Sequence, residues 1–190
     1  MCVGMKANKN LIGNLIILLS ERCKPLYHTK LLKLLFLIDE ASVKKNGHPI
    51  TWLSYQVWQH GPVAPDIYSS KFKGINRFSE FVEFRNAGEN KFIVVPLAKF
   101  SDDEFSDLDL ETIDEVISLY GNLNSNKLVD IVHSDNSLWS KTKKRENLHF
   151  SEKDTTSNVE LNFTELLDND FKKTLYYSAL ENIELQSTLK

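Results

Sequence analysis

The segment that most constrains the fold is residues 31–38, where every side chain except Lys33 is apolar. It lies within a helix predicted from about Thr29 to residue 46, with a capping threonine at its start, two lysines in its last turn and Gly47 after its end. A helix that is apolar on all sides has no face for solvent. We therefore expect this helix to lie at the centre of the fold, with neighbours on most sides.

A second helix is predicted before it, over residues 8–22, where apolar side chains recur at helical spacing until Pro25. Its apolar run, 11–19, is much shorter than the ~20 residues that span a membrane. No small-residue cleavage site follows, as a signal peptide would need. We interpret this segment as a helix of a soluble protein with no membrane association.

The residues after the central helix change to β-branched and aromatic types, which favour strands. Residues 50–58 predict one strand, and residues 78–85 and 91–95 predict a hairpin. Further helices are predicted over 101–121, from Ser125 onward, and as one or two closing helices within 163–185. The expected fold class is α+β, a mostly helical single domain with a small inserted antiparallel β-sheet.

Composition limits the classes of partner. The net charge is −3, so no overall positive field attracts nucleic acid or an anionic membrane. The dense basic cluster at 141–145 is expected to be a solvated face. The two cysteines, Cys2 and Cys23, form no CxxC pair, which fits a reducing cytoplasm.

The sequence contains no motif that indicates an enzyme. Its five histidines lack metal-site spacing, and no nucleophile elbow, Walker loop or dinucleotide fingerprint is present. The adjacent carboxylates at 102–104 are expected to be solvated charges, and a nucleophilic pair of Cys23 with a distant histidine is a weak alternative. We therefore expect no catalytic residue, metal or cofactor.

Residues 57–68, VWQHGPVAPDIY, predict a stiff corner between a strand and a helix. Gly61 can adopt a positive φ, Pro62 fixes the next φ, and Pro65 suits the first turn of a helix. Such a corner would hold Trp58, His60 and Tyr68 in fixed directions, so that they would lose little entropy on contacting a partner. The alternative is a structural role, with the aromatics packed on the central helix and His60 hydrogen-bonded to nearby backbone.

Four motifs, in order over residues 30–139, resemble the Panacea antitoxin domain, also called the SocA-like or GepA-like domain of a phage-associated family. The first comprises Lys30, Leu31, Lys33, Leu34, Leu35 and Phe36; the second Trp58, His60, Gly61, Pro62, Val63, Pro65 and Tyr68; the third Ile113, Asp114, Val116, Tyr120 and Gly121; and the fourth His133 and Trp139. The chain departs from the pattern in having Leu32 for a usual glutamine, His60 for a commoner tyrosine, and no proline before Trp139.

The resemblance implies a bacterial or phage antitoxin, with the domain over 1–145 and a C-terminal extension, 146–190, that is expected to be helical and packed on it. Family members neutralise a toxin encoded beside them by binding it, and some deliver the toxin to a protease of the AAA+ class. Alternatives are therefore a proteolytic adaptor and a DNA-binding autorepressor using residues 141–145. Nucleic acid is the less favoured partner because the chain is acidic overall.

Within this resemblance we expect Lys33 to be structural. A buried, unpaired ammonium costs free energy, so the side chain should extend outward or pair with Asp114 or Asp66. The toxin would meet aromatic anchors on the surface. The candidate anchors are Trp52, Tyr55, Tyr68 and Trp139.

Overall fold

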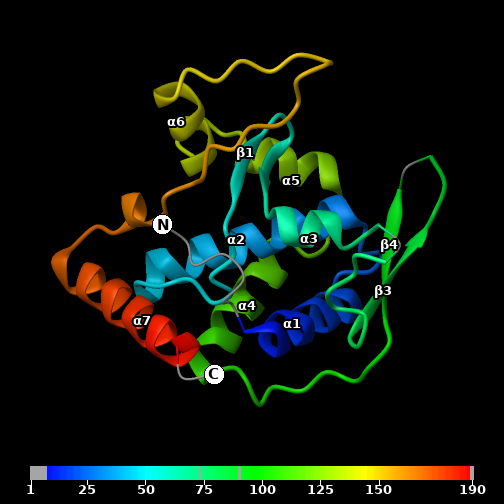
Figure 1. The fold of residues 1–190 in the computed structure, drawn as a ribbon, viewed down its shortest axis with the longest axis horizontal. Helices are drawn as coiled ribbons and strands as arrows, with labels where there is room; N and C mark the ends of the chain where they lie inside the picture. The colour runs from blue at the N-terminus through cyan, green and yellow to red at the C-terminus, as the bar shows by residue number, and fades with distance from the viewer. Residues whose placement is uncertain (1–7, 73, 90, 189–190) are drawn as a thin grey trace.

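The computed structural model describes residues 8–188 except 73 and 90 (Figure 1). The elements are α1 (Lys9–Arg22), α2 (His28–Asn46), β1 (Gln56–Trp58), β2 (Gly61–Val63), α3 (Pro65–Ser69), β3 (Val82–Asn86), β4 (Phe92–Pro96), α4 (Asp107–Tyr120), α5 (Ser125–Val132), α6 (Leu138–Arg145), the short 3₁₀ helix η1 (Phe163–Leu166) and α7 (Asp170–Thr188). The fold is α+β and mostly helical, and the described residues form two separate two-stranded antiparallel sheets where one small sheet was predicted.

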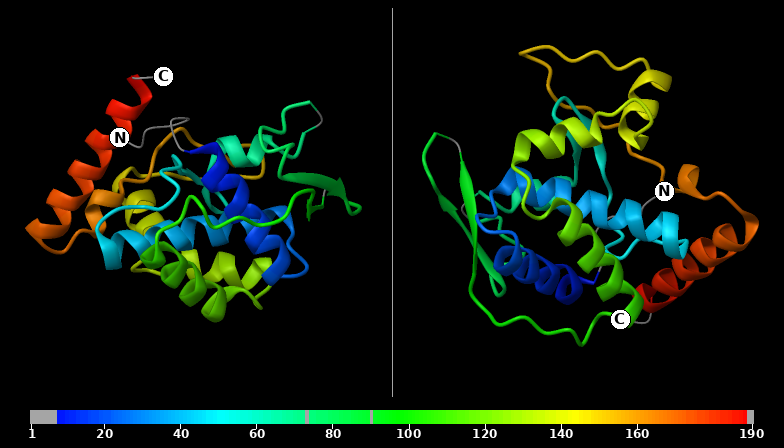
Figure 2. Two further views of the ribbon diagram at one scale, coloured as in Figure 1. Left: turned by 90° about the horizontal axis from the view of Figure 1, so that it is seen from below. Right: turned by 180° about the vertical axis from the view of Figure 1, so that it is seen from behind.

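Helix α2 is the central element, as its apolar sequence predicts. It contacts α4, α5, β2 and η1, and residues 31–38 are all buried. It ends at Gly47, whose φ of 87° is in the left-handed region that glycine favours. Helix α7 lies near its C-terminal end and the β3–β4 hairpin near its N-terminal end (Figures 1 and 2).

The strand predicted over 50–58 is wrong for its first six residues, since only Gln56–Trp58 form a strand. The backbone N–H groups of Ile50 and Thr51 donate to the buried carboxylate of Asp39 on α2, at 2.9 and 2.8 Å, and Trp52 has a φ of 54°. These contacts turn the backbone toward α2, so that segment cannot join a ladder.

The corner predicted at residues 57–68 is instead a tight hairpin followed by a helix. Strand β1 reverses into β2, with Trp58 opposite Gly61 and Val57 opposite Pro62. Gly61 has the predicted positive φ, 100°, and Pro65 occupies the first turn of α3. Gly61 therefore begins a second strand, where the sequence had suggested that it ended the first.

The later helices differ from expectation mainly at their ends. Helix α4 starts at Asp107, because Ser106 and Asp109 form a capping box there. Helix α5 begins at Ser125, and the side chain of Asn124 caps it. Helix α6 was not predicted, since its sequence is mostly polar, yet it buries Leu138, Trp139 and Thr142.

The C-terminal segment packs against the rest of the fold at several places, including the contact of η1 with α2. Residues 155–161 run beside β1, where the N–H groups of Val57 and Gln59 donate to the carbonyls of Val159 and Thr155 at 2.9 and 2.8 Å. On α7, Tyr176 packs its ring on Trp52 with centroids 5.2 Å apart. Within the described ranges, none of the helices combines the length and hydrophobicity required to cross a bilayer.

Candidate functional site

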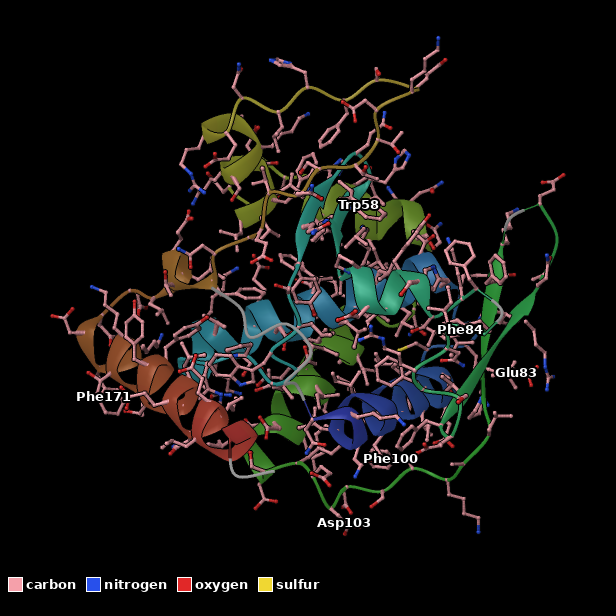
Figure 3. The ribbon with its side chains drawn as sticks, viewed as in Figure 1. Trp58, Glu83, Phe84, Phe100, Asp103 and Phe171 are labelled. Atoms are coloured by element: carbon pink, nitrogen blue, oxygen red, sulfur yellow. The ribbon has the colours of Figure 1, made fainter. Side chains whose placement is uncertain are left out.

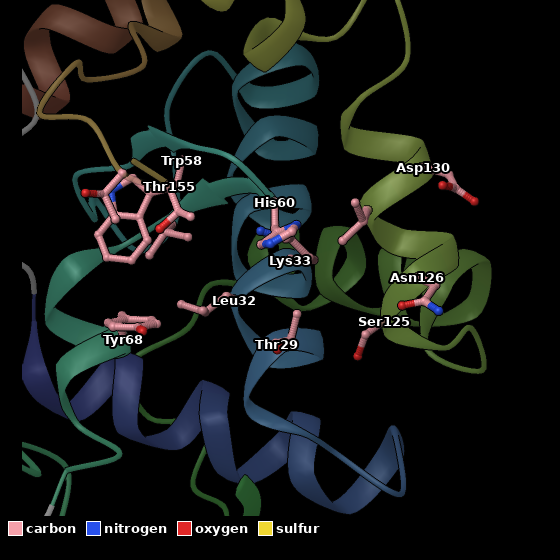
Figure 4. Close-up of a pocket in the computed structure, with 13 residues that line it drawn as sticks. Thr29, Leu32, Lys33, Trp58, His60, Tyr68, Ser125, Asn126, Asp130 and Thr155 are labelled. Carbon is pink, nitrogen blue, oxygen red and sulfur yellow. The ribbon is translucent and has the colours of Figure 1, made fainter. Parts of the chain in front are cut away.

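A pocket of about 570 Å³ lies between α2, the β1–β2 hairpin, α3 and α5 (Figure 4). In Figure 4, Trp58 and Tyr68 stand on one side of α2 and the residues of α5 on the other, with Lys33 and His60 between them. Its lining residues are Thr29, Leu32, Lys33, Trp58, His60, Val63, Tyr68, Ser125, Asn126, Val129, Asp130, Thr155 and Thr156. The pocket thus brings together five of the predicted motif residues, Lys33, Trp58, His60, Val63 and Tyr68.

Lys33 forms part of the wall of this pocket, although its side chain is only 1% exposed. Its Nζ donates a hydrogen bond to the carbonyl of Pro62 at 2.9 Å. The predicted outward extension and the predicted partners are both wrong, because Asp114 pairs with Arg22 and Asp66 pairs with Arg77. Burial lowers the pKa of Lys33 from its ordinary 10.5 to about 7.

The aromatic side of the pocket consists of Trp58 and Tyr68, whose rings meet edge to face with centroids 4.8 Å apart. Trp58 is half-buried, and its Nε1 donates to Oε1 of Gln56 at 3.1 Å. Tyr68 is also half-buried, and the Nζ of Lys71 lies 3.8 Å from its ring centroid. Both rings are therefore fixed by contacts within the chain and still line the cavity.

The two motif histidines occupy different environments. His60 is exposed in the turn between β1 and β2 and lines the pocket. His133 follows α5 and stacks on Trp139, with ring centroids 3.9 Å apart. Burial, followed by the nearby charge of Lys33, lowers the pKa of His133 to about 4. Its buried Nε2 has no hydrogen-bond partner among the described residues.

The four motif segments are joined to one another by side-chain hydrogen bonds. Lys30 Nζ donates to the carbonyl of Gly121 at 2.6 Å, which ties α2 to the end of α4. Lys33 ties α2 to β2 through Pro62, and Trp139 Nε1 donates to the carbonyl of Trp58 at 3.0 Å, which ties α6 to β1. These hydrogen bonds give Lys30, Lys33 and Trp139 a structural role.

The remaining motif residues lie outside the pocket. A Cβ on Gly121 would stand 2.5 Å from the carbonyl oxygen of Ile117, so the chain has no room for a side chain there. Tyr120 is half-buried against the core, and Asp114 is exposed in its ion pair with Arg22.

Three of the four predicted surface anchors are core residues. Trp52, Tyr55 and Trp139 are 6%, 0% and 4% exposed, so the expectation that they face a partner is wrong for this structure. Trp52 is covered by Tyr176 of α7, and Tyr55 donates its hydroxyl to Asp39 at 2.8 Å. Tyr68 alone of the four is half-buried.

Asp39 is an important residue that the motif analysis missed. Its fully buried carboxylate accepts hydrogen bonds from the N–H groups of Ile50 and Thr51, from the Thr51 hydroxyl and from Tyr55. Burial raises its pKa to about 6, against the lowering effect of these donors. The sequence feature that could have identified Asp39 is its position, since it is an acidic residue directly after the apolar run of 34–38. By contrast, nothing in the local sequence marked Thr29, Ser125, Asn126 and Asp130 as lining residues.

A cluster of three or more His, Cys, Asp or Glu side chains suited to a metal ion does not occur in the described part of the chain. The comparisons agree with the motif pattern. The family model described as antitoxin SocA-like, Panacea domain, matches residues 31–140, which is more than half of the 190 residues. No curated protein and no solved structure matches the chain. The chain belongs to the SocA-like Panacea antitoxin family.

Proposed function

We propose that this protein is an antitoxin that neutralises a toxin encoded beside its own gene by binding that toxin directly, without catalysis. The observation that carries the proposal is the family match over residues 31–140, which includes most of the pocket wall. Antitoxins of this kind act by covering a surface of the toxin. The toxin-binding surface of this chain should therefore contain exposed, ordered aromatic side chains.

The surface that fits best extends from Tyr68 along the end of α3. Phe72 and Ile75 are 45% and 50% exposed, and the rings of Tyr68 and Phe72 lie 6.1 Å apart. Lys71 lies over both rings, 3.8 Å and 5.3 Å from their centroids. We call Tyr68, Lys71, Phe72 and Ile75 the α3 surface. It adjoins the pocket through Tyr68, so one partner could contact both.

The proposal takes direct occlusion as the mechanism, with delivery to a AAA+ protease as the alternative that shares the binding step. A transcriptional role through residues 141–145 has less support, because two of the cations in this cluster are paired with acids. Lys144 pairs with Asp135, and Arg145 pairs with Glu146 and Glu165.

The test is co-expression of the chain with each neighbouring open reading frame, scored for growth rescue and co-purification. Phe72→Asp should abolish both, because it places a charge in the α3 surface. The matched control is Phe171→Asp on α7, which is 72% exposed and lies at the left edge of the molecule in Figure 3, away from Trp58. If Phe72→Asp rescues growth as completely as the control does, the α3 surface is not the binding surface. If co-expression with none of the neighbouring open reading frames shows growth rescue, the proposed function is wrong.

Toxin half-life separates the two mechanisms. Under occlusion the toxin persists in the cell in an inactive complex, and its half-life is unchanged or longer when the chain is present. A half-life that shortens only in cells containing the protease would establish the adaptor mechanism in place of occlusion.

A further inference from the structure

The wall of the pocket contains a buried cation that has no acidic partner. Lys33 is 1% exposed, and its Nζ donates to the Pro62 carbonyl. Over residues 8–188 without 73 and 90, no carboxylate forms an ion pair with it, and burial alone accounts for its lowered pKa. An ammonium can donate three hydrogen bonds, and one carbonyl does not offset the loss of its hydration. This lysine is therefore suited to accept a counter-ion from outside the chain.

The first turns of two helices contribute side chains to the wall of the same pocket. Thr29 is in the first turn of α2, and Ser125 and Asn126 are in the first turn of α5. The first N–H groups of a helix have no acceptor within it and carry partial positive charge. The N-cap of α2, Tyr27, makes no side-chain capping hydrogen bond. The pocket thus combines one buried ammonium with the first turns of two helices, of which α5 is capped by the side chain of Asn124.

The other groups in the wall limit the kind of anion. Leu32, Val63 and Val129 are apolar, and Trp58 and Tyr68 add ring surface, so the anionic group should be attached to an apolar stem. Asp130 places one negative charge on the α5 side. A carboxylate with a single charge meets less repulsion from Asp130 than a phosphate with two would.

We propose that this pocket receives a carboxylate of the partner protein, from an aspartate or glutamate side chain or from the chain terminus, and that this carboxylate pairs with Lys33. The inference rests on the proposed function, because the partner is the toxin. The volume of about 570 Å³ is enough for a side chain and its neighbours. In the complex the ammonium would be charged and paired, so part of the energy lost by burying it in the free protein would be recovered on binding.

The test measures the affinity and the titration of Lys33 in the same complex. Lys33→Met keeps the length of the side chain and removes the charge, and should weaken binding of the purified toxin roughly 10- to 100-fold. The control is Lys45→Met, which removes a charge from the other end of α2, where Lys45 pairs with Glu111 and Glu115, and should leave the affinity unchanged. Thermal unfolding of each variant shows that it is folded.

The second readout is the pKa of Lys33 from the ¹³Cε resonance of lysine-labelled protein, assigned by its loss in Lys33→Met. Titratable groups near Lys33 are His28, His60, Asp130 and His133. Their resonances are followed in a parallel titration of uniformly ¹³C- and ¹⁵N-labelled protein. Binding of the toxin should raise the pKa of Lys33 by about 1 to 3 pH units, as an opposite charge nearby does.

The outcomes are distinct. A toxin complex in which the pKa of Lys33 is unchanged and Lys33→Met binds normally overturns this inference and leaves the proposed function standing. Absence of any complex overturns both. Sodium acetate and inorganic phosphate are the free-anion probes. If either alone raises the pKa as much as the toxin does, while Lys33→Met leaves toxin affinity unchanged, the pocket is a small-anion site and the inference is wrong.

Discussion

The indole Nε1 of Trp139 donates a hydrogen bond to the backbone carbonyl of Trp58 at 3.0 Å. The two residues are distant in sequence and belong to different family motifs, so this bond holds α6 against the hairpin that forms one side of the pocket. Trp139 is also stacked on His133. The same side chain therefore fixes the positions of two motif segments.

Trp139→Phe should lower the free energy of unfolding by roughly 1–3 kcal/mol, because it removes the hydrogen bond to the Trp58 carbonyl and part of a buried ring. Trp58→Phe is the matched control, since its own Nε1 donates to the half-buried side chain of Gln56, and it should cost less. Urea unfolding measures both. A larger loss for Trp58→Phe would contradict the role given to Trp139.

Gly61→Ala should destabilise the protein more than Gly88→Ala. Both glycines have positive φ, 100° and 92°, so both variants incur backbone strain of about 1–2 kcal/mol. A Cβ on Gly61 would also lie 2.8 Å from Val132 and 3.1 Å from Lys33 Nζ, whereas a Cβ on Gly88 has no heavy atom of the described residues within 4 Å. The crowding should add about 1–3 kcal/mol. Equal denaturation midpoints for the two variants would show that the hairpin can move away from α2.

Asp39→Ala should lower the free energy of unfolding by about 3 kcal/mol or more, since it leaves several buried donors without an acceptor. Thr51→Val removes one of those donors and keeps the carboxylate, so we expect a loss of about 1 kcal/mol. Chemical denaturation gives both values. If the alanine variant loses no more than the valine variant, Asp39 does not organise residues 50–55.

The unfolding free energy should depend on pH through Lys33. Its pKa is about 7 in the folded protein and has its ordinary value, 10.5, when unfolded. Between these values the unfolded chain binds more protons, so stability rises with pH, by at most about 1.4 kcal/mol per pH unit.

Lys33→Met should lack this component, so the parent protein should gain stability relative to the variant as pH rises from 7 to 10.5. Other titrating groups, including Lys30 and Cys23, contribute to both proteins and cancel in the difference. Denaturation series at several pH values provide the measurement. A difference that stays constant over this range would mean that Lys33 titrates normally when folded.

The central helix could be predicted well because the residues that determine it lie within the helix itself and directly after it. A long apolar run that ends at Gly47 determines a buried helix whatever lies around it, although the predicted cap, Thr29, is wrong: it lies inside the helix, whose N-cap is Tyr27. The positive φ of Gly61 and the position of Pro65 at the start of α3 were predictable for the same reason, since they follow from what each residue can adopt.

The errors concern long-range contacts. Residues 50–55 have strand-like side chains, but Asp39 of a preceding helix takes the N–H groups that a ladder would need. From its local sequence Trp52 was predicted to be a surface anchor, but in the structure Tyr176 of α7, far along the chain, covers it. The partner of Lys33 could not be inferred from charge, because it is the backbone carbonyl of Pro62.

The pocket could be predicted only in part. Lys33, Trp58, His60 and Tyr68 were marked by their motifs, but its other wall comes from α5, which lies far away in sequence. Which face of α5 meets α2 is decided by tertiary packing. The apolar periodicity of a short helix does not specify that partner.

The most direct test of the central claim is an assay of the toxin's own activity with purified components and no protease. The account predicts that adding this chain to the neighbouring gene's product reduces that activity to background at a fixed molar ratio. Toxin activity that stays undiminished at an excess of the chain, or that falls only after a protease and ATP are supplied, would contradict neutralisation by direct binding.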